Sequence, residues 1–188
     1  MYKKRVFILL LICQHLLHAQ QPLNLSFETK SLDGLTRPWG WNIYGSTSLE
    51  SVGMDSTQQL HGKYSLRIEA HPSPSVLSYR FLPFELEKQN VSIKSWMKGG
   101  NFKGKISLLL FYYTNQGPSE SLRADSLVIE SINADWSSHT LQTIIKDAVA
   151  GEIEFQIIVE GVGTIWLDHF SLSINGKSKS TLEIAPPF

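Results

Sequence analysis

The sequence predicts an all-β protein built as a two-sheet antiparallel β-sandwich. About nine short apolar or alternating runs, which are typical of strands, follow one another along the chain. Beyond the first nineteen residues, no window of a dozen residues keeps an apolar stripe at three- and four-residue spacing without Gly, Pro or β-branched runs that break it, so helices are not expected there. Without crossover helices a parallel α/β sheet is excluded, and a sandwich or a barrel remains.

The expected strands are separated by residues that favour turns. In chain order the runs are 23–28, 64–70, 76–81, 91–97, 105–113, 125–130, 139–145, 152–160 and 164–174. The turn signals between them are Asp33-Gly34, His61-Gly62, Pro72, Pro74, Gly99-Gly100, Asn115-Gln116-Gly117-Pro118, Gly161 and Gly163.

Alternation within these runs favours the sandwich, because every second side chain then faces the core between two sheets. The residues expected to point inward are Leu66, Ile68, Ile93, Met97, Ile153, Phe155, Ile157, Val159, Ile165 and Leu167. Those expected to point outward are Arg67, Lys94, Trp96, Glu154, Gln156 and Trp166. Two outward tryptophans can be explained by a cover, provided by a loop or by the long 29–62 segment, or by a binding surface, and the sequence leaves both explanations open.

The first nineteen residues have the features of a secretory signal peptide. A basic start at Lys3, Lys4 and Arg5 precedes the short apolar run VFILLLICQHLL, and Leu17-His18-Ala19 offers a cleavable end. The run is too short to span a bilayer comfortably, and Ile12 stands where a lipoprotein would have a small residue before Cys13. We therefore expect residues 1–19 to be cleaved and the protein to be secreted or periplasmic in a bacterium, with no transmembrane segment in the mature chain.

The mature chain is expected to be one domain, residues 20–176, followed by a short C-terminal tail, residues 177–188. Removing Lys3, Lys4 and Arg5 leaves 14 basic residues against 17 acidic ones, a formal charge of −3, which does not suggest a nucleic-acid partner. The only cysteine leaves with the signal peptide, so a core, and not a disulfide, must hold the fold. The tail contains no linker into a catalytic domain, so a solitary module is expected.

Several fragments in order resemble a known family. They are NLSFE at 24–28, PWGW at 38–41, HGKYSLRIE at 61–69, VSIKSWMKGG at 91–100, the lone Trp136 and GVGTIWLDHFSL at 161–172. Their order is similar to that of the galactose-binding-like β-jelly rolls of bacterial carbohydrate-binding modules, especially families 4, 9 and 22. Similar modules stand at the N-terminus of larger secreted enzymes, including erythromycin-esterase-like proteins. The resemblance implies that the sandwich is a jelly roll.

Asp168 lies in the middle of an apolar strand, where an ionised carboxylate needs a partner. The resemblance implies a structural calcium ion held by Glu28, the Lys63 carbonyl and Asp168, and hard oxygen ligands suit that ion. The family usually has Asp-Asp where this chain has Asp168-His169. The alternative is that Asp168 caps a backbone turn, or pairs with Lys63 or Arg67, without any metal.

No catalytic motif stands out, so we expect a protein that is not an enzyme. The strand at 152–156 is similar to the acidic strand of certain jelly-roll glycoside hydrolases, in which alternate carboxylates face the cleft. Glu152 and Glu154 would share a face, but Gln156 stands where a third carboxylate is needed and cannot act as a general acid.

Sugar binding needs flat aromatic rings and fixed polar groups. The candidate ligand-binding residues are Trp96, Tyr113, Glu160, Trp166, Arg80 and Gln156. The resemblance supports Glu160, because xylan-binding relatives have a Glu before the Gly-rich turn that leads into the last strand. The stacking aromatic that those relatives carry after the GKYSLRI strand is absent from residues 71–75. Trp39, Trp41 and Tyr44 could supply another platform or belong to the core.

The predicted function is therefore that of a secreted, non-catalytic carbohydrate-binding module that contacts a poly- or oligosaccharide, or a glycan-bearing surface. The alternative is an accessory domain of the same fold that binds a partner protein through Trp96 and Trp166. An enzyme acting on glycans through a dispersed site is the third possibility.

Overall fold

The computed structural model describes residues 23–32, 37–45, 51–82, 89–114, 121–145, 150–179 and 183–184, so the expected signal peptide lies outside the described residues. The described part of the chain is built from strands. They are β1 Trp41–Gly45, β2 Val52–Asp55, β3 Ser65–Ala70, β4 Ser75–Leu82, β5 Gln89–Thr114, β6 Ser121–Ile129, β7 Ser137–Ile145, β8 Ala150–Ile174, β9 Lys177–Lys179 and β10 Glu183–Ile184. Within these residues no helix is long and apolar enough to cross a membrane.

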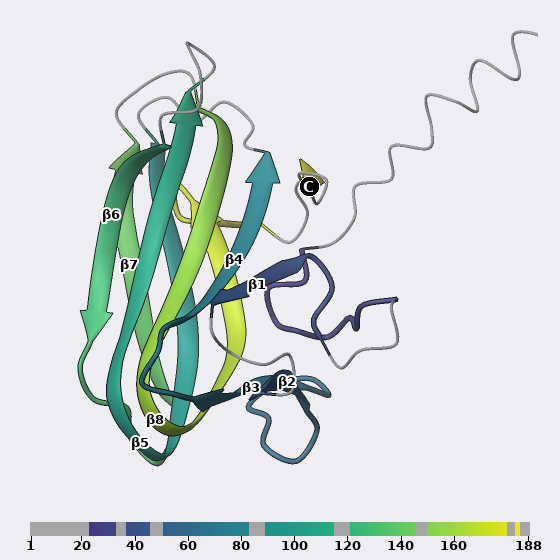
Figure 1. Cartoon of the computed structure of the whole chain (residues 1–188). Helices are drawn as coiled ribbons and strands as arrows, with labels where there is room; N and C mark the ends of the chain where they lie inside the picture. Colours follow the sequence, from purple (N-terminus) through teal and green to yellow (C-terminus); the bar gives the residue numbers. More distant parts are fainter. Residues whose placement is uncertain are drawn as a thin grey trace, which may run out of the picture.

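Two long strands, β5 and β8, form the central pair of the fold. They pair antiparallel along almost their whole length, from Val91 opposite Ile174 to Thr114 opposite Ala150. Figure 1 shows them running side by side and curving together. Each strand has a different neighbour in its first and second halves, so the pair belongs to two sheets.

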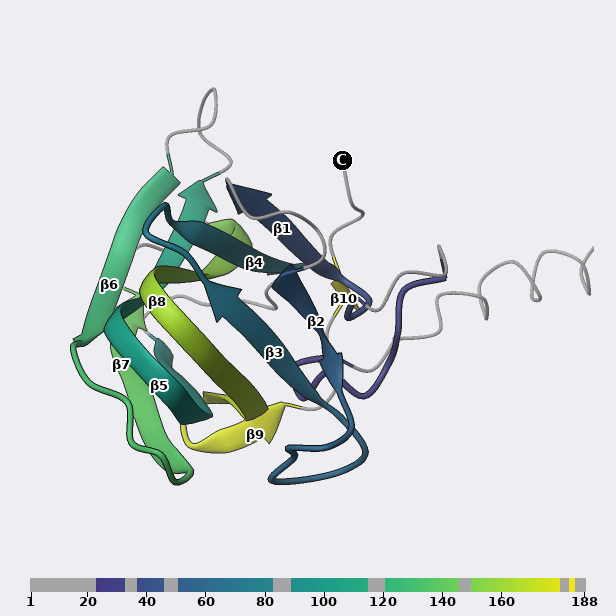
Figure 2. The same cartoon turned by 60° about the horizontal axis from the view of Figure 1, so that its bottom comes forward.

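The neighbours of the long pair define the two layers of a sandwich. Sheet A has the order β1-β4-β8-β5-β6, with residues 150–160 of β8 and 105–114 of β5, and β10 also pairs with β4. Sheet B has the order β2-β3-β8-β5-β7, with residues 163–174 of β8 and 89–100 of β5, and β9 also pairs with β8. Figure 2 shows β8, β3 and β2 side by side in sheet B. The expected antiparallel sandwich is confirmed.

Glycines allow β5 and β8 to pass from one sheet to the other. Gly163 has a φ of +108°, and a Cβ on it would lie 2.6 Å from the Asn101 carbonyl oxygen. A Cβ on Gly161 would lie 2.4 Å from the Lys103 carbonyl oxygen. The two backbones are therefore too close at the bend for any side chain. The sequence interpretation treated Gly99-Gly100, Gly161 and Gly163 as turns that separate strands. In the structure these glycines lie inside the continuous strands β5 and β8.

The core lies between the two sheets and confirms the predicted alternation. All ten residues expected to point inward are buried, with exposed fractions of 2% or less. Trp41 joins them, packing its ring 5.1 Å from that of Phe27 and 5.2 Å from that of Tyr79. Trp41 is thus a core residue and does not supply a binding platform.

The segment 23–28, expected to be a strand, is an irregular turn. The Asn24 side chain donates to the carbonyl oxygens of Thr29 and Trp39, at 2.8 and 2.9 Å, and accepts from the Thr29 N–H. Phe27 takes a positive φ of 61° and is fully buried. Asn side chains compete with strand pairing for backbone groups, which explains why this segment is a loop. Its alternating apolar residues anchor the loop in the core.

The other differences concern short strands. β1, β2, β9 and β10 were not predicted, since five residues or fewer give little alternation to detect. Residues 177–179 and 183–184, placed in the expected tail, pair with β8 and β4.

Candidate functional site

The structure divides the predicted sugar-binding residues between two opposite faces. Arg80, Gln156 and Glu160 lie on the outward side of sheet A, since their strand neighbours Tyr79, Phe81, Phe155, Ile157 and Val159 are in the core. Trp96 and Trp166 lie on the outward side of sheet B, between the buried positions Met97, Ile165 and Leu167. Tyr113 belongs to β5 in sheet A, and its side chain lies outside the described residues. The two groups are separated by the core and cannot contact one ligand unit together.

A hydrogen-bonded cluster occupies the middle of the outward side of sheet A. Arg80 of β4 and Glu154 of β8 are paired in register, and the Arg80 guanidinium lies 3.0 Å from the Glu154 carboxylate. The Gln156 side chain donates to the other Glu154 oxygen at 2.8 Å. Glu154 is only 2% exposed although it points outward. An ionised carboxylate is held there because a cation and an amide both contact it.

The next row of residues across sheet A adds smaller polar groups. Ser78 of β4 lies opposite Gln156 of β8 and opposite Asn42 of β1. Ser78 is fully buried, and its hydroxyl has no hydrogen-bond partner among the described residues. A buried hydroxyl without a partner is uncommon in folded proteins.

A row of apolar residues borders this cluster. Tyr44 of β1, Val76 of β4 and Ile158 of β8 are consecutive neighbours across the outward side of sheet A. Tyr44 is 51% exposed, while Val76 and Ile158 are partly buried. An exposed aromatic ring beside fixed polar groups is the combination that pyranose rings require.

Glu160 lies further along the same strand, where β5 and β8 bend between the sheets. Its carboxylate lies 2.9 Å from the Lys105 ammonium. Both residues line a shallow pocket of about 490 Å³. The remaining lining residues are Pro72, Lys103, Gly104, Glu130, Gly161 and Val162. The pocket places Glu160 at the edge of the outward side of sheet A, with a cation beside it.

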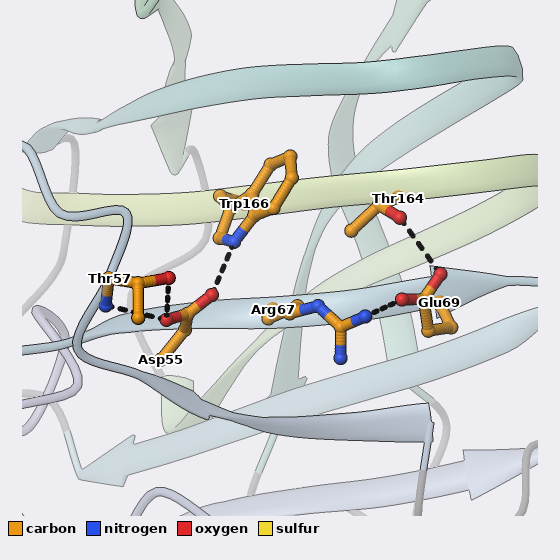
Figure 3. Close-up of polar contacts among 6 residues, drawn as sticks. All are labelled: Asp55, Thr57, Arg67, Glu69, Thr164 and Trp166. Carbon is orange, nitrogen blue, oxygen red and sulfur yellow. Dashed lines mark hydrogen bonds and ion pairs between the residues drawn. The ribbon is translucent and has the colours of Figure 1, made fainter.

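The outward side of sheet B carries a second polar and aromatic cluster, drawn in Figure 3. The Trp166 indole N–H donates to Asp55 at 2.8 Å, and Asp55 also accepts from the Thr57 amide and hydroxyl at 2.6 and 2.7 Å. Arg67 forms an ion pair with Glu69, which accepts from the Thr164 hydroxyl at 2.9 Å.

The hydrogen bonds onto Asp55 govern its ionisation. Burial acts to raise its pKa, but the hydrogen bonds from Thr57 and Trp166, with the Arg67 charge, outweigh it and lower the pKa below the ordinary value. Asp55 is therefore a carboxylate at neutral pH and accepts the indole N–H.

Trp96 has a different environment on the same side of sheet B. The Lys94 ammonium lies over its ring, 5.2 Å from the ring centroid. A cation over one face of an indole is a favourable contact, and it occupies that face. Trp166 is therefore the better of the two predicted stacking rings.

The 56–63 segment lies against one end of this face, as the sequence had suggested for part of 29–62. The Lys98 ammonium donates to the Gln58 side chain at 2.8 Å, and the Leu60 and His61 amides donate to Asp168 at 2.7 and 2.9 Å. The segment thus covers Asp168 and leaves the Arg67–Glu69 pair partly exposed, at 43% and 34% for the two side chains.

Asp168, which is fully buried, is held by backbone amides. Besides Leu60 and His61, the His169 N–H donates to its other oxygen at 2.6 Å. Burial raises its pKa, against the lowering effect of these three amides, and the negative charge of Glu28 raises it further. The expected alternative in which Asp168 caps a backbone turn agrees with these contacts, whereas Arg67 pairs with Glu69.

Glu28 faces the same turn, since its carboxylate accepts from the Lys63 amide at 2.9 Å. Two carboxylates therefore meet at residues 60–63, and neither forms an ion pair with a Lys or Arg side chain among the described residues. One Asp168 oxygen already accepts two amides, from Leu60 and His61, while its other oxygen and the Glu28 carboxylate each accept a single amide. The lone pairs that remain are hard oxygen donors of the kind that a divalent cation such as Ca²⁺ takes. The described residues hold no cluster of three His, Cys, Asp or Glu side chains suited to a metal, so backbone carbonyls would have to complete the site.

His169 marks the departure from the Asp-Asp pattern. It has a positive φ of 49° beside an irregularity in the pairing of β5 and β8, and its ring lies 4.7 Å from that of His61. A β-bulge here turns the next residue, Phe170, into the core. Where the resemblance implies a second carboxylate, this chain has a ring that lies against the His61 ring of the turn.

The sequence interpretation missed several polar residues of the two faces: Asn42, Ser78, Asp55, Thr57, Glu69 and Lys105. Ser78 had a usable signal, since it alternates with Arg80 along one strand. The Asp55-x-Thr57 spacing is typical of a side chain that caps its own turn. The pairings Glu69–Thr164 and Lys105–Glu160 join distant segments, and no local pattern predicts them.

Comparisons with known proteins place the fold. No protein-family model matches the sequence, and no curated protein matches it. Among solved structures, the family 61 carbohydrate-binding module in complex with β-1,4-galactotriose aligns with a TM-score of 0.55 and 21% identity, covering 80% of this chain and 94% of that one. The CBM22-1 xylan-binding domain of Paenibacillus barcinonensis Xyn10C aligns with a TM-score of 0.54 and 14% identity, covering 81% and 92%.

The same fold also occurs within a larger enzyme. The enzymatically active domain of bacteriophage CBA120 tailspike protein 4 aligns with a TM-score of 0.60 and 13% identity, and the match covers 81% of this chain but 21% of that one. At these identities the similarity concerns the fold alone. The chain therefore has the galactose-binding-like β-sandwich fold of carbohydrate-binding modules.

Proposed function

We propose that this protein is a secreted, non-catalytic carbohydrate-binding domain that holds a poly- or oligosaccharide on the outward side of sheet A. The observation that carries the proposal is the buried Glu154 carboxylate, fixed between Arg80 and Gln156 on a surface that faces away from the core. A preformed polar cluster loses little freedom when it binds hydroxyl groups.

The neighbouring residues supply what sugar recognition needs besides fixed polar groups. Tyr44 offers an exposed ring on the same side of the sheet as the polar cluster. Glu160 and Lys105 extend the polar surface along β8. Because Arg80 and Lys105 are each matched by a carboxylate, these two pairs suit a neutral glycan better than a strongly charged one.

A non-catalytic role agrees with the environment of Glu154. In the hydrolase interpretation this residue would serve as one of the reacting carboxylates, but it is ion-paired and almost fully buried. Gln156 contributes a hydrogen-bond donor and no acidic proton. Solved relatives of this fold that bind β-1,4-galactotriose and xylan support a glycan as the ligand class.

A structural calcium ion at Glu28, Asp168 and the backbone of residues 60–63 belongs to the proposal as a stabilising ion. It would compensate the buried charge of Asp168, whose pKa is raised by burial and by the negative charge of Glu28. The proposed calcium site lies against sheet B and would not contact a sugar bound to sheet A.

Affinity gel electrophoresis of the mature protein in gels that contain β-1,4-galactan, xylan or other soluble polysaccharides tests the proposal. We expect retardation in at least one gel, and an affinity about tenfold lower, or about 1.4 kcal/mol, for Tyr44→Ala and for Gln156→Ala. The matched control is Ile144→Ala, which removes an exposed apolar side chain (60% exposed) from the opposite sheet. Equal retardation of all variants would refute the site, and no retardation in any gel would favour the protein-interaction alternative.

A further inference from the structure

Trp166 lies along the surface of sheet B and does not stand away from it. Its N–H reaches Asp55 at the end of β2, two strands away, while the far edge of its six-membered ring lies over Gly100 of β5, where a Cβ would come within 2.7 Å. Figure 3 shows the indole crossing β8 in this way. Gly100 thus makes room for the ring, and Trp166 stays partly exposed.

The ring is held in this orientation before any ligand arrives. Asp55 fixes the indole N–H, and Thr57 fixes Asp55 through two hydrogen bonds. A side chain locked by such a chain of contacts loses little entropy on binding, which is the requirement for a stacking platform.

Polar groups stand at the edge of the ring. Arg67 of β3 is the register partner of Trp166, and Thr164 is the next outward residue along β8. Arg67 and Glu69 form an ion pair, Thr164 donates to Glu69, and the Arg67 and Glu69 side chains stay partly exposed. A guanidinium and a carboxylate in fixed positions present donors and acceptors to sugar hydroxyls.

The surroundings of Trp166 favour a sugar over a protein partner. Protein interfaces have an apolar centre with several large side chains. Among the described residues on or against this outward side, the exposed large apolar side chains include Ile144 of β7, opposite Asn90, at 60%, and Leu60 of the covering segment, at 40%. Trp166 lies opposite Lys98, eight residues further along β5 and roughly 26 Å away at strand spacing. The fixed Trp166 ring, with charged groups at its edge, matches a pyranose.

We propose that the outward side of sheet B is a glycan-binding site of its own, centred on the Trp166 ring, with Arg67, Glu69 and Thr164 contacting the sugar hydroxyls. It deepens the proposed function, since it takes the same ligand class, but it uses different residues on the opposite side of the sandwich. A domain with a site on each side can bridge two glycan chains, and two weak sites on one polysaccharide network reinforce each other.

The experiment measures the number of oligosaccharides bound per chain by isothermal titration calorimetry, and the light scattering of a long polysaccharide mixed with the protein. We expect the wild type to bind two oligosaccharides and to increase scattering. Trp166→Ala should bind one oligosaccharide, and its increase in scattering should be at least tenfold smaller than that of the wild type. Trp166→Phe should retain both sites because it keeps a ring. Ile144→Ala should match the wild type. If Trp166→Ala unfolds, Arg67→Ala takes its place as the test variant. Arg67→Ala should stay folded, because the exposed Arg67–Glu69 ion pair adds little stability.

The results separate this inference from the proposed function. If Trp166→Ala and Arg67→Ala both keep the wild-type stoichiometry and scattering while Tyr44→Ala loses affinity, the sheet A site stands and the Trp166 site is refuted. If Trp166→Ala abolishes all binding and Tyr44→Ala has no effect, the Trp166 site is supported and the sheet A site fails. Binding of no glycan by the wild type would refute both.

Discussion

The Arg80 guanidinium contacts the Glu154 carboxylate at 3.0 Å, and this pair is why a glutamate can be buried on the outward side of a sheet. Arg80 on β4 and Glu154 on β8 lie directly opposite each other in the register of the two strands. Ion pairs at exposed surfaces contribute little to stability, but Glu154 is 2% exposed, so solvent screens this pair weakly.

Replacing Arg80 by Met therefore lowers the free energy of unfolding by about 3 kcal/mol, because a buried carboxylate loses its main charge compensation. Urea unfolding at neutral pH measures the loss. The double variant Arg80→Met/Glu154→Gln should recover at least half of it, since it removes the buried charge together with its partner. If the single variant is as stable as the wild type, the pair is not coupled and the cluster is not preformed.

Gly163 is a second position where one change has a large expected effect. Gly163→Ala should destabilise the protein by more than about 2 kcal/mol, because its φ of +108° disfavours a side chain and the new Cβ would lie 2.6 Å from the Asn101 carbonyl oxygen. Gly176→Ala is the control, since Gly176 also has a positive φ, +74°, but nothing within 4 Å of the added atom. It should lose about 1–2 kcal/mol from backbone strain alone. Equal losses in urea unfolding would mean that the close approach at the bend has no cost.

The sequence predicted the strands and their inward residues because alternation is a local property. Leu66, Ile68, Phe155 and Ile157 are buried as expected, since each lies in a run long enough to show the pattern. Residues 23–28 also alternate, but the Asn24 side chain and the buried Phe27 make them a loop. A pattern of apolar residues indicates burial there and does not specify pairing.

The division of the candidate site between two faces could not be predicted in the same way. Gln156 and Trp166 lie on one continuous strand, and both were expected to point outward. Gly161 and Gly163, between them, let the strand leave sheet A and enter sheet B, so the two outward directions are opposite. The turn residues were identified, but whether a glycine ends a strand or bends it depends on the pairing with β5, which is a long-range contact.

Asp168 shows the same limit in a single residue. Its sequence context established that a buried carboxylate needs compensation, and the structure gives it three backbone amides from Leu60, His61 and His169. Two of these donors lie more than 100 residues away in the chain, at separations of 108 and 107. Backbone donors have no residue type, so no sequence motif identifies them.

Calcium should raise the melting temperature of the mature protein, and EDTA should lower it. An ion that binds only the folded form stabilises it by RT ln(1 + [L]/Kd), or about 2.7 kcal/mol at a hundred times Kd. Differential scanning fluorimetry with millimolar calcium, magnesium or EDTA measures the shift. Glu28→Gln should lose the calcium response while keeping a similar melting temperature in EDTA, because its exposed amide contact contributes little. Identical wild-type melts with calcium and EDTA would leave the backbone amides as the whole explanation of Asp168.

Tyr79 should make stability depend on pH in the alkaline range. Burial raises the pKa of its hydroxyl to about 12, against the lowering effect of the Asn24 amide that it accepts at 3.2 Å. The folded protein therefore keeps this proton more strongly than the unfolded chain, in which the pKa is 10.0. The stabilising contribution is complete below pH 10 and is lost as the pH rises from 10 to 12, by about 2–3 kcal/mol in total.

Tyr79→Phe isolates this effect. The variant should be about 1 kcal/mol less stable than the wild type at neutral pH, because the Asn24 amide loses its acceptor. As the pH rises above 10 the wild type alone loses the tyrosine contribution, so the two stabilities should converge and then cross. Urea unfolding at intervals between neutral pH and about pH 11.5 follows both curves. Parallel curves over that range would show that the Tyr79 hydroxyl ionises equally easily in the folded and unfolded chains, and that its burial does not govern its proton.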